Sequence, residues 1–130
     1  MIANWMRPLF VVAGLYDGLL GLAFLICAPR IFNSFGVTPP NHFGYVQFPA
    51  LLLIIFAIMF FRIAQNPVGN RDLIFYGIAL KLSYCGVAFW HHLHGGIPFM
   101  FVPWAWADLV FLLLFLLAWK QTGPGERALH

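Results

Sequence analysis

Four long apolar stretches divide this chain, and their length is the strongest constraint on what it can fold into. A helix of about 20 apolar residues spans the ~30 Å hydrocarbon core of a bilayer. Backbone N–H and C=O groups find no partner in lipid, so such stretches satisfy them internally as helices. We expect transmembrane helices over residues 8–28, 44–63, 72–93 and 103–120. The sequence therefore predicts an all-α integral membrane protein, a single four-transmembrane-helix bundle over residues 1–130.

The composition excludes a soluble globular protein. Hydrophobic residues make up 62% of the chain and charged residues only 8%, whereas soluble domains carry about 25% charged residues. The lipid bilayer is therefore the expected partner. The formal net charge of +3 is a small excess without a clustered basic face, so no nucleic-acid partner is predicted.

The first apolar stretch has the outline of a secretory signal peptide, because Arg7 precedes a hydrophobic run. Its length, however, is that of a membrane span. It also contains Tyr16 and Asp17 near its centre, and signal peptides normally exclude an acid there. We expect it to be retained as the first helix.

The segments outside the helices differ in character. Residues 29–43 contain Gly36, Pro39, Pro40 and Asn41, which interrupt regular structure. Several of their side chains are apolar, so we expect this loop to lie along the membrane interface. Residues 121–130 include Gly-Pro-Gly and are expected to form a mobile tail.

The distribution of basic residues predicts the orientation. With four spans, both termini and the second loop share one side of the membrane. That side carries five basic residues: Arg7, Arg62, Arg71, Lys120 and Arg127. The opposite side carries Arg30 alone. The positive-inside rule therefore predicts cytoplasmic termini (N-in/C-in) in a bacterial-type inner (plasma) membrane.

Ionisable residues within membrane spans are energetically costly and mark the first candidate site. Asp17 and Lys81 each lie nine residues beyond the expected start of their helix, or roughly 13–14 Å along it. Asp108 lies within reach of a lysine side chain from that depth. We predict that these three residues meet at the midplane, with Tyr84 and Gln47 as further members of a ligand or proton pocket. The same cluster could instead fix helix packing, and the sequence leaves both roles open.

Histidines at the outer ends of the helices form a second candidate site. His91 and His94 are three residues apart on one helical face, and His42 lies on the same side of the membrane. Imidazole groups suit copper or zinc, although the spacing matches no metal motif. Haem is not expected, because the first and fourth spans contain no histidine that could serve as a facing axial ligand.

The segment G-L-Y-D-G-L-L-G, from Gly14 to Gly21, and the order of the spans resemble the DoxX-like small four-helix membrane proteins. The resemblance implies the fold, together with a link to membrane redox systems. It transfers no functional residue to this chain.

These observations favour a non-catalytic membrane protein that binds a small lipophilic or ionic ligand, or that serves as an accessory subunit of a larger membrane complex. No nucleophile motif or phosphate-binding loop is present, and no catalytic residue is predicted. Two alternatives stay open at this stage. One is a homo-oligomeric proton- or ion-coupled transporter or channel, and the other is a metal- or quinone-linked membrane oxidoreductase.

Overall fold

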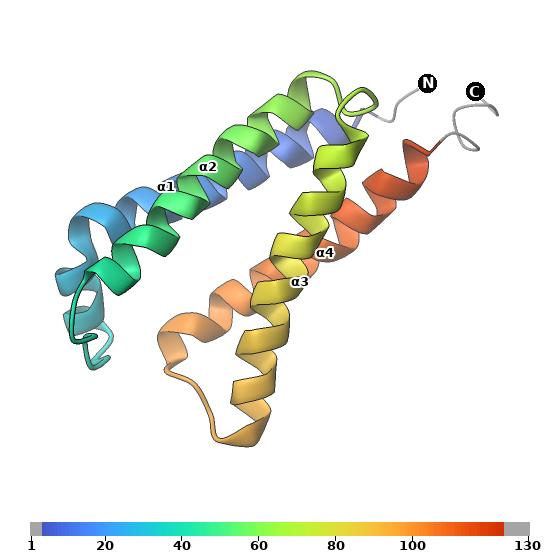
Figure 1. The fold of residues 1–130 in the computed structure, drawn as a ribbon. Helices are drawn as coiled ribbons and strands as arrows, with labels where there is room; N and C mark the ends of the chain where they lie inside the picture. The colour runs from blue at the N-terminus through green and yellow to red at the C-terminus, as the bar shows by residue number, and fades with distance from the viewer. Residues whose placement is uncertain (1–3, 124–130) are drawn as a thin grey trace.

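A computed structural model describes residues 4–123, and the regular structure within this range is entirely helical (Figure 1). The elements are α1 (Met6–Ser34), α2 (Gly44–Gln65), α3 (Arg71–His94), the short 3₁₀ helix η1 (Phe99–Phe101) and α4 (Val102–Gln121). Each of the four long helices, α4 together with η1, is long and apolar enough to cross a membrane. The predicted all-α fold with four such helices is therefore confirmed. Of the predicted tail, residues 124–130 lie outside the described residues.

The largest difference from the predicted boundaries is at the end of α1. The expected loop at Pro29 is wrong, because the helix continues to Ser34 after a kink. The kink lies at Cys27, whose φ of −118° and ψ of 19° are not helical. Pro29 has no N–H to donate to the carbonyl of Leu25, and its ring crowds that carbonyl, so the helix bends instead of ending.

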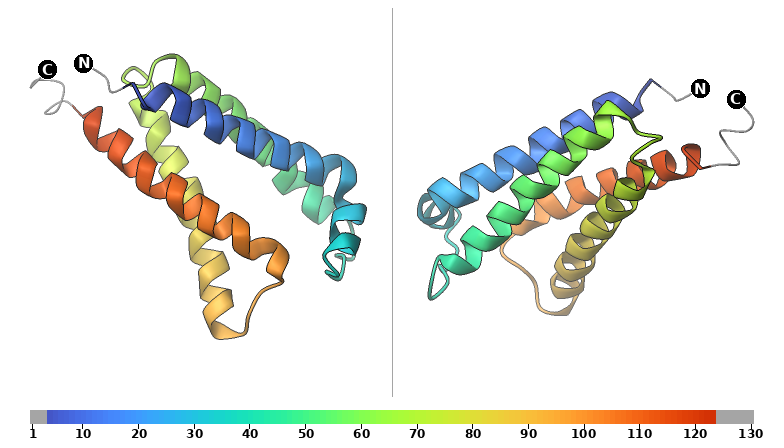
Figure 2. Two further views of the ribbon diagram at one scale, coloured as in Figure 1. Left: turned by 180° about the vertical axis from the view of Figure 1, so that it is seen from behind. Right: turned by 45° about the horizontal axis from the view of Figure 1, so that its top comes forward.

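The helices form two antiparallel pairs. Most helix–helix contacts lie between α1 and α2 and between α3 and α4. The pairs come together near the end where α1 begins, α4 ends and the α2–α3 loop lies, and they diverge toward the opposite end (Figures 1 and 2). Between the pairs, the backbones of α2 and α3 and those of α1 and α4 approach each other at fewer positions, and buried side chains fill the space between them. The divergence determines where space is left inside the molecule.

Glycines on α1 allow the close contact with α2. Gly14 faces the ring of Phe61, and Gly18 faces Ala57, so these two glycines, spaced as the G-x-x-x-G pattern that permits close helix contact, lie against α2. At Gly21, a Cβ atom would lie 2.7 Å from the backbone oxygen of Ala50. A backbone atom cannot move aside as a side chain can, so this position requires glycine.

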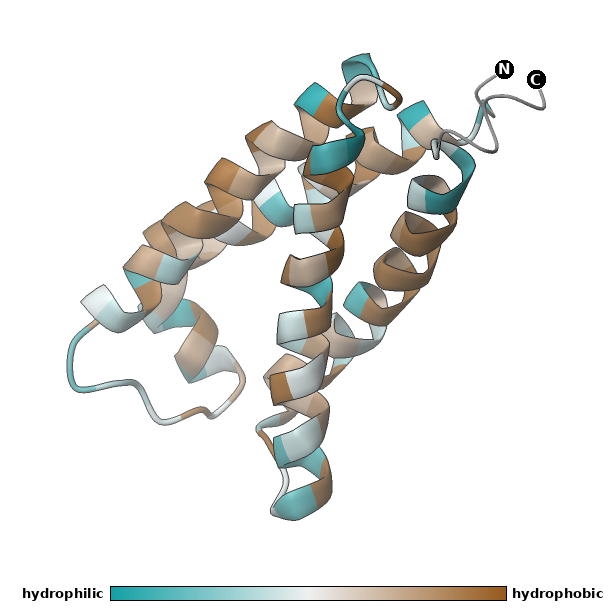
Figure 3. Ribbon diagram, turned by 45° about the vertical axis from the view of Figure 1, so that its right-hand side comes forward, coloured by the Kyte–Doolittle hydropathy of each residue, from teal (hydrophilic) through white to brown (hydrophobic). Residues whose placement is uncertain are grey.

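All four helices contribute to a core near the end that carries the termini. Phe10, Phe60, Ile74 and Phe115 are each fully buried there. The rings of Phe10 and Phe115 stack with their centroids 4.9 Å apart. A second, smaller core at the opposite end includes Phe24, Phe32 and Met100. The outer faces of the helices are predominantly apolar (Figure 3), which matches a lipid environment.

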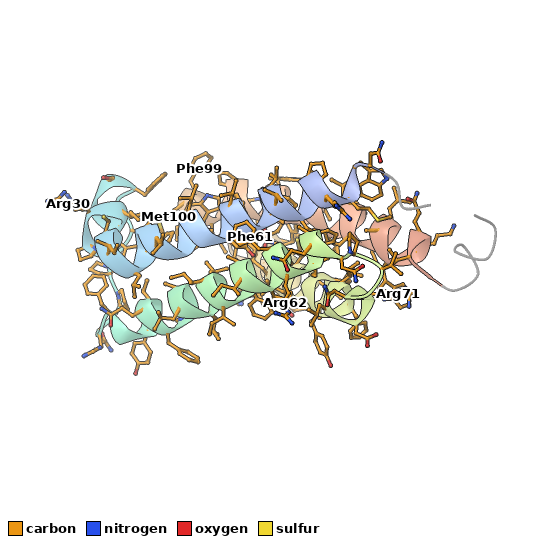
Figure 4. The ribbon with its side chains drawn as sticks, turned by 90° about the horizontal axis from the view of Figure 1, so that it is seen from above. Arg30, Phe61, Arg62, Arg71, Phe99 and Met100 are labelled. Atoms are coloured by element: carbon orange, nitrogen blue, oxygen red, sulfur yellow. The ribbon has the colours of Figure 1, made fainter. Side chains whose placement is uncertain are left out.

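Arg71, at the start of α3 (Figure 4), contacts the end of α4. Its Nε donates a hydrogen bond of 2.9 Å to the carbonyl oxygen of Trp119. Its guanidinium carbon lies 3.8 Å from the centroid of the Trp119 ring, which is cation–π geometry. The contact closes the α3–α4 pair at the end where the two pairs meet.

The close approach at Gly21 predicts the effect of adding one methyl group. Gly21→Ala should destabilise the protein by about 1–3 kcal/mol, because the new Cβ overpacks the α1–α2 contact. Gly86→Ala is the matched control, since a Cβ there meets nothing within 4 Å, and alanine is favoured over glycine within a helix by about 1 kcal/mol. Thermal unfolding in a mild detergent measures both. Equal melting temperatures for the two variants would contradict the close contact.

Candidate functional site

Three charged side chains from three helices meet in the interior. The Lys81 Nζ atom of α3 lies 2.8 Å from Asp17 Oδ1 of α1 and 3.1 Å from Asp108 Oδ1 of α4. The exposed fractions of the three residues are 1% for Asp17, 1% for Lys81 and 7% for Asp108. The predicted convergence of these residues, here named the charged cluster, is therefore confirmed.

Aromatic rings surround the lysine. Its Nζ lies 5.2 Å from the ring centroid of Phe111, 5.4 Å from that of Tyr16 and 5.6 Å from that of Phe60. Each distance is within the range over which a ring face attracts a cation. The rings also exclude polar solvent, which strengthens the attraction between Lys81 and the carboxylates. The ammonium group is thus held by two carboxylate oxygens and an aromatic shell.

Two buried polar atoms beside Lys81 have no hydrogen-bond partner among residues 4–123. They are Asp17 Oδ2 and the Tyr16 hydroxyl oxygen. A buried polar group without a partner costs about 1–3 kcal/mol, and a charged one costs more. Such atoms are rare in folded proteins and need an explanation. The charged cluster therefore has hydrogen-bonding capacity that the described part of the chain does not use.

A cavity of about 420 Å³ adjoins the charged cluster. Asp17, Lys81 and Asp108 form part of its wall, and most of the other residues around it are apolar or aromatic. Residues of all four long helices and of η1 line it, so it lies between the two helix pairs. The cavity reaches the outer surface beside α2, because Tyr45 and Leu52 line it and are also exposed. It therefore joins a buried polar end to the lipid-facing side of the molecule.

The two other residues predicted for the pocket differ in position. Tyr84 lines the cavity, and its hydroxyl group donates a hydrogen bond of 3.0 Å to the carbonyl oxygen of Phe101. This bond ties α3 to η1 at the cavity wall. Gln47 is exposed on α2 and does not line the cavity, whereas Pro49, two residues later, does.

The predicted metal ligands form no cluster in the described structure. His42 is exposed, and its Nδ1 accepts a 2.9 Å hydrogen bond from the N–H of Gly44. His94 stacks on Trp90, with ring centroids 4.1 Å apart, and His91 is exposed in the last turn of α3. Residues 4–123 contain no group of three or more His, Cys, Asp or Glu side chains that could hold a metal ion.

Several residues of the cavity wall were not predicted from the sequence. Tyr16, Leu20 and Phe24 all line the cavity from α1, and Trp104 lines it from α4. The three residues on α1 are spaced four apart and therefore share a helical face, next to the face that carries Asp17. Since Asp17 was expected to point inward, this spacing could have predicted that the neighbouring face also lines the interior.

No known protein family, curated protein or solved structure matches this chain. The resemblance to DoxX-like proteins therefore stays a prediction.

The geometry of the charged cluster predicts how it responds to losing the lysine. Lys81→Met should destabilise the protein by about 3–5 kcal/mol, because it leaves two buried carboxyl groups without their cation. The triple variant Asp17→Asn/Lys81→Met/Asp108→Asn should recover part of that loss, since it leaves no buried charge. The exposed Lys120→Met should change stability by less than about 0.5 kcal/mol.

Unfolding in mixed detergent micelles with increasing denaturing detergent gives the free energy of each variant. A Lys81→Met variant as stable as Lys120→Met would show that the charged cluster contributes nothing to the fold.

Proposed function

We propose that this small four-helix membrane protein binds an amphiphilic small molecule in the cavity between its two helix pairs. The apolar body of the ligand lies against the cavity wall, and its polar end meets the charged cluster. The observation that carries the proposal is the unpartnered, buried Oδ2 atom of Asp17, a residue that lines a cavity whose other lining residues are mostly apolar or aromatic. A ligand that hydrogen-bonds to this atom removes the cost of leaving it buried alone.

The form of the cavity supports this function. Its volume of about 420 Å³ lies within the range of about 300–1,000 Å³ that is typical of small-molecule sites. Such sites are mostly apolar and contain a few polar groups that fix the orientation of the ligand. A cluster that served only to hold helices together would not need an apolar space beside it. The combination therefore favours binding over a purely structural role.

We also propose that the end of the molecule with both termini faces the cytoplasm of a bacterial-type inner membrane. Arg62 lies in the last turn of α2 and Arg71 at the start of α3, at that end, whereas Arg30 lies at the other (Figure 4). Arg7 in the first turns of α1 and Lys120 at the end of α4 add to the same basic end. The positive-inside rule supports this orientation.

Filling the cavity should abolish ligand binding. Leu20→Trp places a larger side chain in the cavity wall, and Leu19→Trp is the matched control because Leu19 is exposed and lies outside that wall. We expect single-chain ten-carbon amphiphiles to bind one-to-one to the wild type and to Leu19→Trp. Binding to Leu20→Trp should be at least tenfold weaker.

Isothermal titration calorimetry in nanodiscs of zwitterionic lipid, corrected with empty nanodiscs, measures this binding. Thermal unfolding confirms that both tryptophan variants are folded. Undiminished binding to a folded Leu20→Trp would contradict a site in this cavity.

The orientation predicts which loops an impermeant thiol reagent reaches from outside the cell. Single cysteines at Thr38, in the first loop, and Gln65, at the end of α2, are introduced after the free thiols Cys27 and Cys85 are replaced. Thr38→Cys should react in intact cells. Gln65→Cys should react only after the membrane is opened, and the reverse pattern would overturn the orientation.

A further inference from the structure

We propose that the ligand is a protonated alkyl amine, with its ammonium group at Asp17 and its hydrocarbon chain along the apolar wall of the cavity. This inference rests on the proposed binding function and specifies the chemical class of its ligand. It follows from three properties of the cavity: its charge balance, its hydrogen-bonding capacity and its aromatic wall.

The charge balance of the cavity favours a cation. The described residues of its wall include two carboxyl groups, Asp17 and Asp108, and one amino group, Lys81. With all three ionised, the wall carries one surplus negative charge, which is costly in an apolar environment. A ligand with one positive charge neutralises that surplus, whereas an anionic ligand doubles it.

The free hydrogen-bonding capacity requires a donor. Asp17 Oδ1 already accepts a hydrogen bond from Lys81, and Oδ2 has no partner among the described residues. An ionised carboxylate oxygen can only accept. A primary ammonium group carries three N–H donors, one of which can bind Oδ2, and the buried Tyr16 hydroxyl oxygen on the preceding residue is a second acceptor without a partner among the described residues. A quaternary ammonium has the same charge without any N–H donor, and a carboxylate has neither.

The aromatic wall suits the positive end of such a ligand. Phe24 and Trp104 both line the cavity, and their rings meet edge to face with centroids 5.2 Å apart. Ring faces attract ammonium groups, and tryptophan does so most strongly. The ring of Tyr16 already lies 5.4 Å from the ammonium group of Lys81. A second cation beside Asp17 is therefore near the Tyr16 ring as well as the free carboxylate oxygen, while Phe24, seven residues farther along α1, lines the cavity away from the charged cluster.

Four probes with one ten-carbon chain separate these properties. They are decylamine, which is protonated at pH 7 as a lysine side chain is, decyltrimethylammonium, 1-decanol and decanoate. We expect decylamine to bind the wild type one-to-one and at least tenfold more tightly than any of the other three. The titrations use the full chain in zwitterionic nanodiscs, with empty nanodiscs subtracted to remove partitioning into lipid.

Two variants test whether Asp17 and Tyr16 cause the tighter binding of decylamine. Asp17→Asn should lower the affinity for decylamine at least tenfold, to about that for 1-decanol, while Asp72→Asn, an exposed acid at the start of α3, should leave it unchanged. Tyr16→Phe removes only the hydroxyl group, and it should weaken decylamine binding severalfold without changing 1-decanol binding. This second variant retains the ion pairs of the charged cluster if Asp17→Asn does not fold.

The outcomes distinguish the two proposals. If 1-decanol or decanoate binds as tightly as decylamine, the amine class is wrong and the binding function stands. If decyltrimethylammonium matches decylamine, the requirement for an N–H donor is wrong, and with it the assignment of the ammonium to Asp17 Oδ2. If no probe binds the wild type, both proposals fail.

Discussion

The ion pair between Lys81 and Asp17 is the interaction on which the arrangement of the two helix pairs depends. Lys81 and Asp108 belong to the α3–α4 pair, whereas Asp17 belongs to the α1–α2 pair. Aromatic side chains also pack between the pairs, with Phe10 and Phe60 against Phe115, and this 2.8 Å contact adds a link between buried charges. Breaking a buried ion pair leaves an uncompensated charge at high cost. The three charges therefore fix the register of one helix pair against the other.

The packing on the two sides of the charged cluster is unequal, and the cavity results from this inequality. On the side of the termini, the buried rings of Phe10, Phe60 and Phe115 fill the space between the pairs. On the other side, Gly21 holds α1 against α2 at Ala50, so these helices stay together while the pairs diverge. The space between the pairs is then bounded by aromatic and aliphatic side chains with the charged cluster in its wall. Because α1 and α2 stay in contact while the two helix pairs diverge, an apolar cavity forms beside the charged cluster.

The sequence contained enough information for the spans and for the charged cluster, because both follow from local counts. Hydropathy and length determine the helices, and the rise per residue places Asp17 and Lys81 at equal depth. The predicted end of α1 before Pro29 was wrong, since proline can bend a helix as well as end it. The cavity could not be predicted from any one segment, because it depends on the angle between the helix pairs. The role of Tyr16 could not be predicted either, since whether its hydroxyl group has a hydrogen-bond partner depends on neighbours from several helices.

The ratio of two carboxyl groups to one amino group in the charged cluster favours a binding site over a purely structural contact between helices. One lysine and one aspartate would suffice to join the two helix pairs, and the pair Lys81–Asp17 does so already. Asp108 adds a second carboxyl group to the same ammonium, and the spare oxygen of Asp17 is left buried without a partner among residues 4–123. Neither feature strengthens the contact between the helix pairs, because Asp108 adds a buried negative charge and the free oxygen of Asp17 is a buried acceptor without a donor. Both are useful in a site whose compensating cation arrives with the ligand, and the adjoining apolar cavity provides the space that such a ligand occupies.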